Sequence, residues 1–339
     1  MTKPRVYVTR ILPESGMRLV NERCDATIWR TKGPPPRAEL LAGVRDKDGI
    51  LTLLTDPINA EIMDAAPRLK VISNCAVGVD NIDVQAATAR GIPVGNTPDV
   101  LTDATADLAF ALLLAAARRI VEGVQFVRAG RWQTWDPELL LGADLSGRTL
   151  GIIGLGRIGK AVARRAQGFG LRVIWHDPGP EESEGAGATT LDTLLATSDF
   201  VSLHVPLTAQ THHMINEQSL ARMKPTAILV NTSRGGVVDH DALFRALSEQ
   251  RLFAAGLDVS EPEPIPADSP LLELENCIVL PHLGSASRWT RSQMALLAAE
   301  NLIAGLERRP LPHCVNPEVY ERLSKTALRP DGGENTGPQ

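Results

Sequence analysis

Short apolar runs alternate with segments of helical spacing through the first hundred residues of the chain. Runs rich in leucine and β-branched residues, bounded by Gly, Pro, Asp or Asn, predict buried strands at residues 6–9, 49–54, 69–73 and 92–95. Apolar positions three and four apart predict helices between them, at residues 39–44, 60–66 and 84–90. Strands that alternate with helices in this way are typical of a parallel, doubly wound sheet.

The pattern changes at Thr97-Pro98-Asp99, where apolar residues begin to predict one long helix over residues 101–128. Residues 108–117 are apolar on nearly every side, so this helix is predicted either to lie in a core or to bridge domains or subunits. The next segment contains Trp132 and Trp135 without a clear period and predicts an arm or loop. Its tryptophans suit a subunit contact, although they could equally pack within the chain.

A second alternating series predicts a second domain of the same kind. Its strands are expected at residues 148–153, 172–175, 200–203, 227–230, 254–256 and 277–279, and a helix is expected at 287–306. The predicted fold class is therefore α/β, with two doubly wound, Rossmann-like parallel-sheet domains. Residues beyond 324 are polar and rich in Gly and Pro, which predicts a disordered tail.

Composition and charge exclude several classes of protein. The 339 residues allow about two domains, and 43% hydrophobic with 22% charged residues is the composition of a globular protein. A net charge of −5 gives no general attraction to nucleic acid or anionic membrane, and no apolar run reaches the ~18 residues of a membrane span. No signal peptide is visible. Four cysteines without CxxC spacing predict free thiols, a cytoplasmic protein and no metal site.

The strongest local motif is Gly154-Leu-Gly156-Arg-Ile-Gly159, which lies between a predicted strand and a predicted helix. Gly154 permits a tight turn, Gly156 lets the backbone approach a pyrophosphate, and Gly159 lets the helix pack against the strand. The start of that helix offers free N–H groups and a partial positive charge to phosphates. The motif therefore predicts a dinucleotide site.

Asp177 ends the next predicted strand, 18 residues after Gly159. A carboxylate in this position accepts hydrogen bonds from the ribose hydroxyls and repels a 2′-phosphate, which favours NAD(H) and leaves NADP(H) possible. Residues 179–187 contain no basic side chain for a 2′-phosphate, whereas His176 is a weak indication in favour of NADP(H).

Reactive side chains follow three later strands, at the edge where open α/β sheets bind ligands. Arg234 is followed by two glycines and can bind a carboxylate through two of its guanidinium nitrogens. The second segment contains Asp258, Glu261 and Glu263, and the third contains His282 before a Gly-Ser turn. A lone histidine is more often structural than catalytic, so spacing alone leaves both interpretations of His282 open.

These motifs resemble those of the D-isomer-specific 2-hydroxyacid dehydrogenases over roughly residues 5–320. The resemblance rests on Gly-Leu-Gly-Arg-Ile-Gly (154–159), His-Val-Pro-Leu-Thr (204–208), Asn-Thr-Ser-Arg-Gly (231–235), Gly-Leu-Asp-Val (256–259) and Leu-Pro-His-Leu-Gly-Ser-Ala (280–286). Within this family, residues 97–107 and 260–266 are most similar to the glyoxylate/hydroxypyruvate reductases.

The resemblance implies how the chain is divided into domains. Residues 1–99 and 288–323 would form a flavodoxin-like substrate domain, residues 100–287 an NAD-binding Rossmann domain, and residues 324–339 a tail. The family's catalytic trio matches Arg234, Glu263 and His282, where Glu263 is preferred to Glu261 because it directly precedes the proline that closes its motif.

The remaining site residues also come from the resemblance. Backbone N–H groups of Val77 and Gly78 would hold the substrate carboxylate together with Arg234, and Leu53 would shape the pocket. Residues expected to contact the cofactor are Gly154, Leu155, Gly156, Arg157, Ile158, Gly159, Asp177, Val205, Pro206, Thr211, Thr232, Ser233, Arg234, Asp258, His282 and Gly284.

The implied activity is the reversible, NADH-dependent reduction of a short 2-keto acid, such as glyoxylate or hydroxypyruvate, to the D-2-hydroxy acid. His282 would be the general acid, oriented by Glu263, and Arg234 would bind the carboxylate and the carbonyl oxygen. A homodimer is expected, in which the arm reaches a neighbouring subunit. Two alternatives remain: a dehydrogenase of D-3-phosphoglycerate or another D-2-hydroxy acid, and a non-enzymatic, corepressor-like NAD-binding protein.

Overall fold

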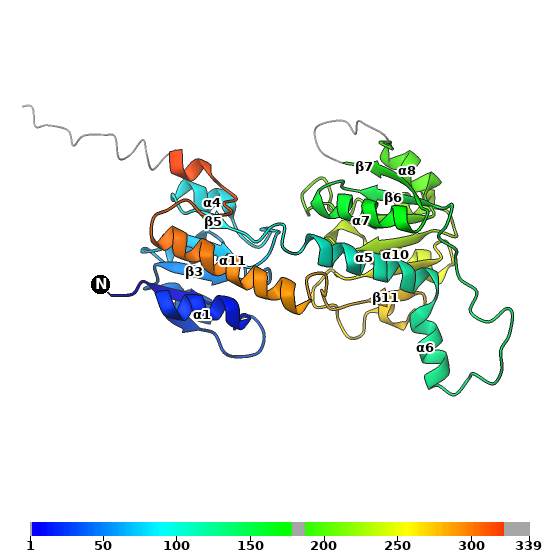
Figure 1. Ribbon diagram of the computed structural model, residues 1–339, viewed down its shortest axis with the longest axis horizontal. Coiled ribbons are helices and arrows are strands. Elements are labelled where there is room, and N and C mark those ends of the chain that lie inside the picture. Colours follow the sequence, from blue (N-terminus) through cyan, green and yellow to red (C-terminus); the bar gives the residue numbers. More distant parts are fainter. Residues whose placement is uncertain (1, 178–186, 322–339) are drawn as a thin grey trace, which may run out of the picture. The chain divides into compact units, whose positions relative to one another are not determined.

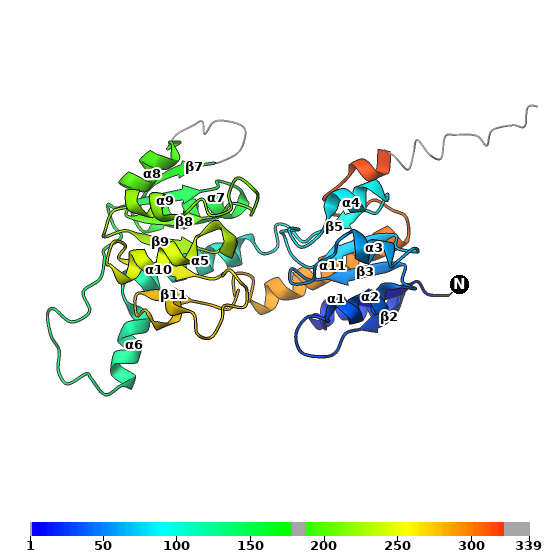
Figure 2. The ribbon, with the colours of Figure 1, turned by 180° about the vertical axis from the view of Figure 1, so that it is seen from behind.

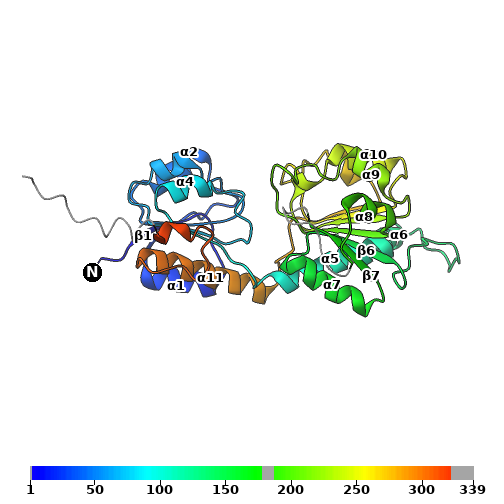
Figure 3. The same ribbon diagram turned by 90° about the horizontal axis from the view of Figure 1, so that it is seen from above.

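The computed structural model describes residues 2–177 and 187–321, so the predicted tail and most of residues 179–187 lie outside the described residues. The chain divides into two compact units, Met1–Val100 with Ser287–Gln339, and Leu101–Ala286. Each unit contains one parallel sheet with helices on both faces, which confirms the predicted α/β class with two doubly wound domains (Figures 1 and 3).

The first unit contains a five-stranded sheet in the order β2-β1-β3-β4-β5, the order of flavodoxin-like folds. In Figure 3, α1 and α11 cover one face of this sheet, and α2 and α4 cover the other. Its strands are β1 (Arg5–Val8), β2 (Asp25–Ile28), β3 (Gly49–Thr52), β4 (Val71–Asn74) and β5 (Val94–Gly95), and its helices are α1 (Glu14–Arg23), α2 (Arg37–Val44), α3 (Ala60–Asp64), α4 (Val84–Ala89) and α11 (Arg288–Leu306).

Two elements of this unit, α1 and β2, were not predicted. Strand β2 lies at the sheet edge and is only partly buried, so it lacks the continuous apolar run by which β3 and β4 are recognised. Helix α1 contains Gly16, a weak helix former. A Cβ at Gly16 would collide with the carbonyl of Ala295 in α11, so tight packing between these helices, invisible in the local pattern, stabilises α1.

The second unit contains a six-stranded sheet in the order β11-β10-β9-β8-β6-β7. Beyond β7, a parallel bridge between Trp175 and Ala188 extends the edge, and with this short segment the order becomes that of dinucleotide-binding folds. The strands are β6 (Thr149–Ile153), β7 (Arg172–His176), β8 (Phe200–Leu203), β9 (Ile228–Asn231), β10 (Ala254–Leu257) and β11 (Cys277–Val279). The helices are α5 (Thr102–Ala117), α6 (Ile120–Arg128), α7 (Arg157–Gly168), α8 (Leu191–Thr197), α9 (Glu217–Arg222) and α10 (His240–Ser248), with short 3-10 turns η1 (Gly235–Val237) and η2 (Pro270–Glu273).

The single long helix predicted over residues 101–128 is wrong, because the chain forms α5 and α6 with a break between them. Arg119 adopts a left-handed backbone conformation, with φ of 49°, and the carbonyl of Ala117 accepts a hydrogen bond from the N–H of Ala143. Helix α5 packs on β9 and β10 and is largely buried, so its apolar stretch belongs to the core of this unit.

Helix α6 and the segment after it project away from the rest of the second unit, as Figures 1 and 2 show. The helix exposes Ile120, Val124 and Val127, and the segment exposes 60% of Trp132 and 78% of Trp135. Both tryptophans are therefore largely exposed in the single chain. None of the helices in residues 2–177 and 187–321 has the length and apolar character needed to cross a bilayer.

Candidate active site

The glycine motif forms the turn between β6 and α7. Gly154 has a φ of +93°, which favours glycine, and a Cβ there would lie 2.8 Å from the carbonyl of His204. A Cβ at Gly156 would meet no atom within 4 Å, whereas a Cβ at Gly159 would collide with the Gly154 carbonyl. The first and third glycines therefore permit tight packing, and the second faces open space at the start of α7, whose first residues are Arg157 and Ile158.

Asp177 lies directly beside this turn. Its Oδ2 accepts a hydrogen bond of 3.3 Å from the N–H of Leu155, and β7, which precedes it, pairs with β6 in parallel register. The carboxylate of Asp177 is thus held at the carboxyl edge of the sheet, next to the loop predicted to bind the pyrophosphate.

The segment after β8 closes around the glycine turn. Val205 is buried, and its Cγ1 would lie 2.9 Å from a Cβ at Gly154. The Thr211 hydroxyl donates a hydrogen bond of 2.6 Å to the carbonyl of Pro206, so this buried side chain shapes the loop from 206 to 211. At the end of β9, the Oγ1 of Thr232 is buried and has no hydrogen-bond partner among the described residues.

Arg234 follows β9 on a turn that Asn231 organises. The buried Asn231 side chain donates to the carbonyl of Arg234 at 2.8 Å and accepts from both the N–H and the hydroxyl of Ser233. Asn231 belongs to the motif at residues 231–235, but no role was predicted for it. An asparagine at the end of a buried strand was the available signal, because a buried amide needs partners.

The two glycines after Arg234 make room for another segment of backbone. A Cβ at Gly235 would collide with the carbonyl of Ser260, and one at Gly236 would lie 3.0 Å from the Glu261 carboxylate. The turn after β9 and the loop after β10 are therefore in direct contact. This contact places Arg234 close enough for its charge to act on the carboxylate of Glu263.

Glu263 and His282 form a close pair, with Oε1 of Glu263 2.6 Å from Nδ1 of His282. Burial opposes ionisation of Glu263, but the hydrogen bond and charge of His282, the N–H of Ser260 and the charge of Arg234 outweigh it and lower the pKa of this carboxyl. The structure thus brings Arg234, Glu263 and His282 together, whereas Glu261 bonds to His213 instead.

Asp258 holds the loop on which His282 lies. Both of its carboxylate oxygens accept backbone N–H groups, from Leu283 at 2.6 Å and Gly284 at 2.7 Å, and its own carbonyl accepts the N–H of His282. Burial raises the pKa of Asp258, although these N–H donors and His282 counteract the shift. His282 has a φ of +56°, a strained conformation that these bonds maintain.

His204 directly follows β8, a central strand of this sheet. It is partly buried, its Nε2 lies 2.8 Å from the Ser202 hydroxyl, and burial lowers its pKa to about 4. A histidine that is neutral at physiological pH cannot deliver a proton as an imidazolium, so His204 is a structural residue.

The first unit holds the remaining predicted residues on loops after β3 and β4. Amide side chains bind the carbonyls of all three: Asn81 that of Leu53, Asn96 that of Val77, and Asn74 that of Gly78, at 2.8–2.9 Å. Within the described part of the chain, no hydrogen bond uses the N–H of Val77 or Gly78. These asparagines, for which no role was predicted, thus hold a loop on which the N–H groups of Val77 and Gly78 are available to a substrate.

The residues of the second unit fit a dinucleotide. Gly156 leaves open space at the start of a 12-residue helix, Asp177 is held beside it, and the Thr232 hydroxyl is a buried donor without an acceptor among the described residues. The last feature matters because a buried polar group without a partner is costly, and a bound ligand would satisfy it.

Comparisons with known proteins agree with this geometry. Residues 110–284 match the family model described as "D-isomer specific 2-hydroxyacid dehydrogenase, NAD binding domain". A glyoxylate reductase from Korarchaeum cryptofilum is 53% identical over 335 residues, covering 97% of this chain and 99% of the relative. A crystal structure of a Thermus thermophilus protein is 50% identical, with a TM-score of 0.87, over 92% of this chain and 99% of the other.

A third relative was solved with a ligand. The NADPH-dependent glyoxylate/hydroxypyruvate reductase from Sinorhizobium meliloti, in complex with NADP and malonate, is 36% identical with a TM-score of 0.82, over 93% of this chain and 98% of the other. The chain belongs to the D-isomer-specific 2-hydroxyacid dehydrogenases, a family of oxidoreductases, and its second unit carries their NAD-binding domain.

Proposed function

We propose that this chain reduces glyoxylate, and the related acid hydroxypyruvate, to the D-2-hydroxy acid with NADH. The observation that carries the proposal is the constellation of Arg234, Glu263 and His282 at the carboxyl edge of a dinucleotide-binding sheet. The glyoxylate reductase of Korarchaeum cryptofilum, similar over nearly the whole length, supports the choice of substrate.

The chemistry divides between cofactor and protein. NADH, when bound, supplies the hydride to the carbonyl carbon of the keto acid. Arg234 binds the substrate carboxylate and stabilises the negative charge that develops on the carbonyl oxygen. His282 donates the proton to that oxygen from Nε2, because Nδ1 is engaged by Glu263. Glu263 orients the ring through its hydrogen bond to Nδ1.

We assign cofactor binding to the second unit, and substrate binding to Arg234 and to residues of the first unit. The glycine turn 154–159, with Leu155, Arg157 and Ile158, would hold the pyrophosphate, and Asp177 would bind the ribose hydroxyls. Val205, Pro206 and Thr211 would line the adenosine site, and Thr232, Ser233, Arg234, Asp258, His282 and Gly284 would surround the nicotinamide. The N–H groups of Val77 and Gly78 would bind the carboxylate, with Leu53 beside them.

We also infer a homodimer that forms through α6 and the arm after it. The exposed Ile120, Val124 and Val127 continue into Trp132 and Trp135, and an apolar face of this kind is typical of a protein interface. A second copy of the chain presents the same face and could bury both at once. We infer a cytoplasmic location, which the four free thiols support.

A substrate panel tests the proposed function. Oxidation of NADH should be fastest, measured as kcat/KM, with glyoxylate and hydroxypyruvate, and slower with pyruvate and 3-phosphohydroxypyruvate. NADPH should support a lower kcat/KM than NADH, because the carboxylate of Asp177 repels a 2′-phosphate. A preference for 3-phosphohydroxypyruvate would replace the proposal by a phosphoglycerate dehydrogenase, and no turnover with any keto acid would favour a non-enzymatic NAD-binding protein.

Replacing Glu263 should slow the reaction, because this residue orients His282. Oε1 of Glu263 lies 2.6 Å from Nδ1 of His282, and the lowered pKa of Glu263 keeps its carboxyl ionised at neutral pH. In Glu263→Gln the charged partner of the ring is lost, so kcat for glyoxylate reduction should fall by about tenfold or more, while KM for NADH changes little. Steady-state kinetics check this. The control is Glu273→Gln, a glutamate of η2, and equal kcat in wild type and Glu263→Gln would contradict the role of Glu263.

A further inference from the structure

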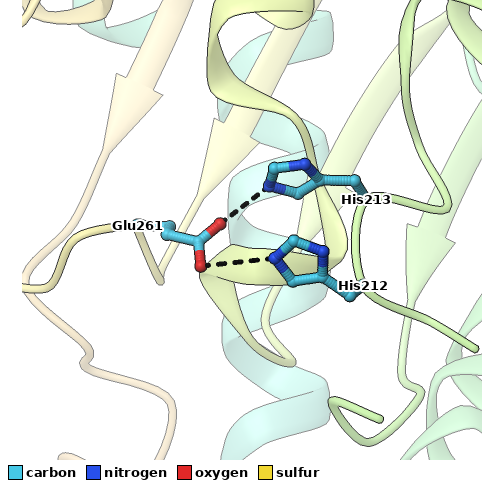
Figure 4. A group of neighbouring side chains, drawn as sticks. All are labelled: His212, His213 and Glu261. Carbon is cyan, nitrogen blue, oxygen red and sulfur yellow. Dashed lines mark hydrogen bonds and ion pairs between the residues drawn. The ribbon is translucent and has the colours of Figure 1, made fainter. Parts of the chain in front are cut away.

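A second cluster of titratable side chains lies beside the loop that carries Glu263. It consists of His212 and His213, from the turn between β8 and α9, and Glu261, from the loop after β10 (Figure 4). The Nε2 of His213 lies 2.9 Å from Oε2 of Glu261, and the Nε2 of His212 lies 3.7 Å from Oε1. The catalytic scheme above uses none of these three side chains.

The two histidines point in the same direction although they are consecutive in sequence. Neighbouring side chains point to opposite faces of a strand and diverge by about 100° around a helix. Here His213 has a φ of +49°, and the two rings stack with their centroids 3.9 Å apart. One ligand atom from each histidine and one from Glu261 all lie within 4.8 Å of one another.

The backbone on both sides of the cluster is held in place. The N–H of His212 donates to the carbonyl of Thr208 at 2.9 Å, and the N–H of His213 donates to the carbonyl of Gly236 at 2.8 Å. The loop with Glu261 packs directly on Gly235, where a Cβ would not fit. The imidazole nitrogens and the carboxylate oxygen are therefore already assembled, so a group that binds them requires little ordering of the side chains.

We propose that His212, His213 and Glu261 bind a divalent transition metal ion of the Zn²⁺ type. Two imidazole nitrogens and one carboxylate oxygen suit Zn²⁺, Co²⁺ or Ni²⁺, whereas Mg²⁺ and Ca²⁺ require oxygen ligands throughout. Bond lengths near 2.0–2.1 Å place tetrahedral ligands about 3.3 Å apart. One nitrogen of each histidine and one oxygen of Glu261 already lie within 4.8 Å of one another, so small movements of these side chains would reach that spacing. Water would complete the coordination, since His212 and Glu261 are exposed.

The bound ion would also restrain the loop that carries Glu263. Glu261 precedes Glu263 by two residues, and its carboxylate would be tied to the turn from 208 to 214 through the metal. The loop from 258 to 266 would then open less often, which amide hydrogen exchange can detect. This consequence concerns the restraint of the loop and does not depend on which keto acid the protein reduces.

Titration of the chelator-treated protein with Co²⁺, followed by its visible absorption, and with Zn²⁺ by calorimetry tests the site. The wild type should bind one ion per chain with micromolar or tighter affinity, and His212→Gln/His213→Gln should lose this binding. Glu261→Gln should bind at least tenfold more weakly, with Glu261→Asp between it and the wild type. The matched control is His313→Gln, a histidine of the first unit, which should bind as the wild type does.

Hydrogen exchange completes the experiment. Zn²⁺ should slow exchange of the amides in residues 258–266 of the wild type and leave them unchanged in the double histidine variant, whose fold circular dichroism verifies. Absence of micromolar binding by the wild type, or equal binding by the wild type and the double variant, would overturn the site. Binding without protection of residues 258–266 would overturn the restraint of the loop.

Discussion

In His282→Ala, kcat for glyoxylate reduction should fall by about 10²–10⁴-fold while the dissociation constant for NADH changes little. The reason is that the variant removes the proton donor but leaves the glycine turn and Asp177 intact, and these lie on separate strands. Stopped-flow measurement of turnover, with NADH binding followed by fluorescence, separates the two quantities.

The controls for this experiment are available in the same chain. His313→Ala removes a histidine of the first unit and should leave kcat near that of the wild type. His282→Gln keeps a polar side chain of similar length that can still reach Glu263, yet should remain as slow as His282→Ala because an amide cannot deliver the proton. A variant that lost NADH binding rather than turnover would show that His282 serves the cofactor site and not proton transfer.

In Arg234→Ala, kcat should fall by about 10²–10³-fold and KM for glyoxylate should rise as well. A guanidinium that binds the carboxylate acts on the ground state, and its interaction with the developing oxyanion acts on the transition state, so both parameters change. Arg234→Lys should recover only part of the loss, since an ammonium group cannot form the two parallel hydrogen bonds of a guanidinium. Steady-state kinetics over a range of glyoxylate concentrations measure both parameters.

A surface arginine provides the comparison for Arg234. Arg251 bonds to Glu249 at 2.8 Å on the outside of the same unit, so Arg251→Ala should keep the kinetic parameters of the wild type. An Arg234→Ala enzyme with unchanged KM would contradict substrate binding by Arg234, and one with unchanged kcat would contradict its stabilisation of the oxyanion.

The structure sharpens the choice between two glutamates. Glu261 and Glu263 lie two residues apart in a proline-rich segment, and local pattern alone does not distinguish them. In the structure, Glu263 reaches Nδ1 of His282, while Glu261 faces His212 and His213. The difference arises from how the loop after β10 packs on Gly235 and Gly236, a contact between segments about 25 residues apart that no local propensity encodes.

Other differences have the same origin. The helix predicted over 101–128 is interrupted because Ala143, 26 residues further along, bonds to the carbonyl of Ala117. No role was predicted for Asn231 and Asn74 because a single asparagine contributes to no periodic pattern. The role of its side chain depends on which carbonyl group lies within hydrogen-bonding distance. Edge strand β2 was missed because only strands buried on both faces have continuous apolar runs.

Local residue patterns were enough to predict the alternation of strands and helices, the glycine turn with its following helix, and the reactive side chains after three strands. These could be predicted because the positions of strands and the starts of helices follow from residue type and spacing. Which groups come into contact is seen only in the folded chain: Glu263 with His282, Asp258 with the backbone of Leu283 and Gly284, and Glu261 with two histidines. Such pairings depend on packing between segments distant in sequence, and the free energy of that packing is not contained in any one segment.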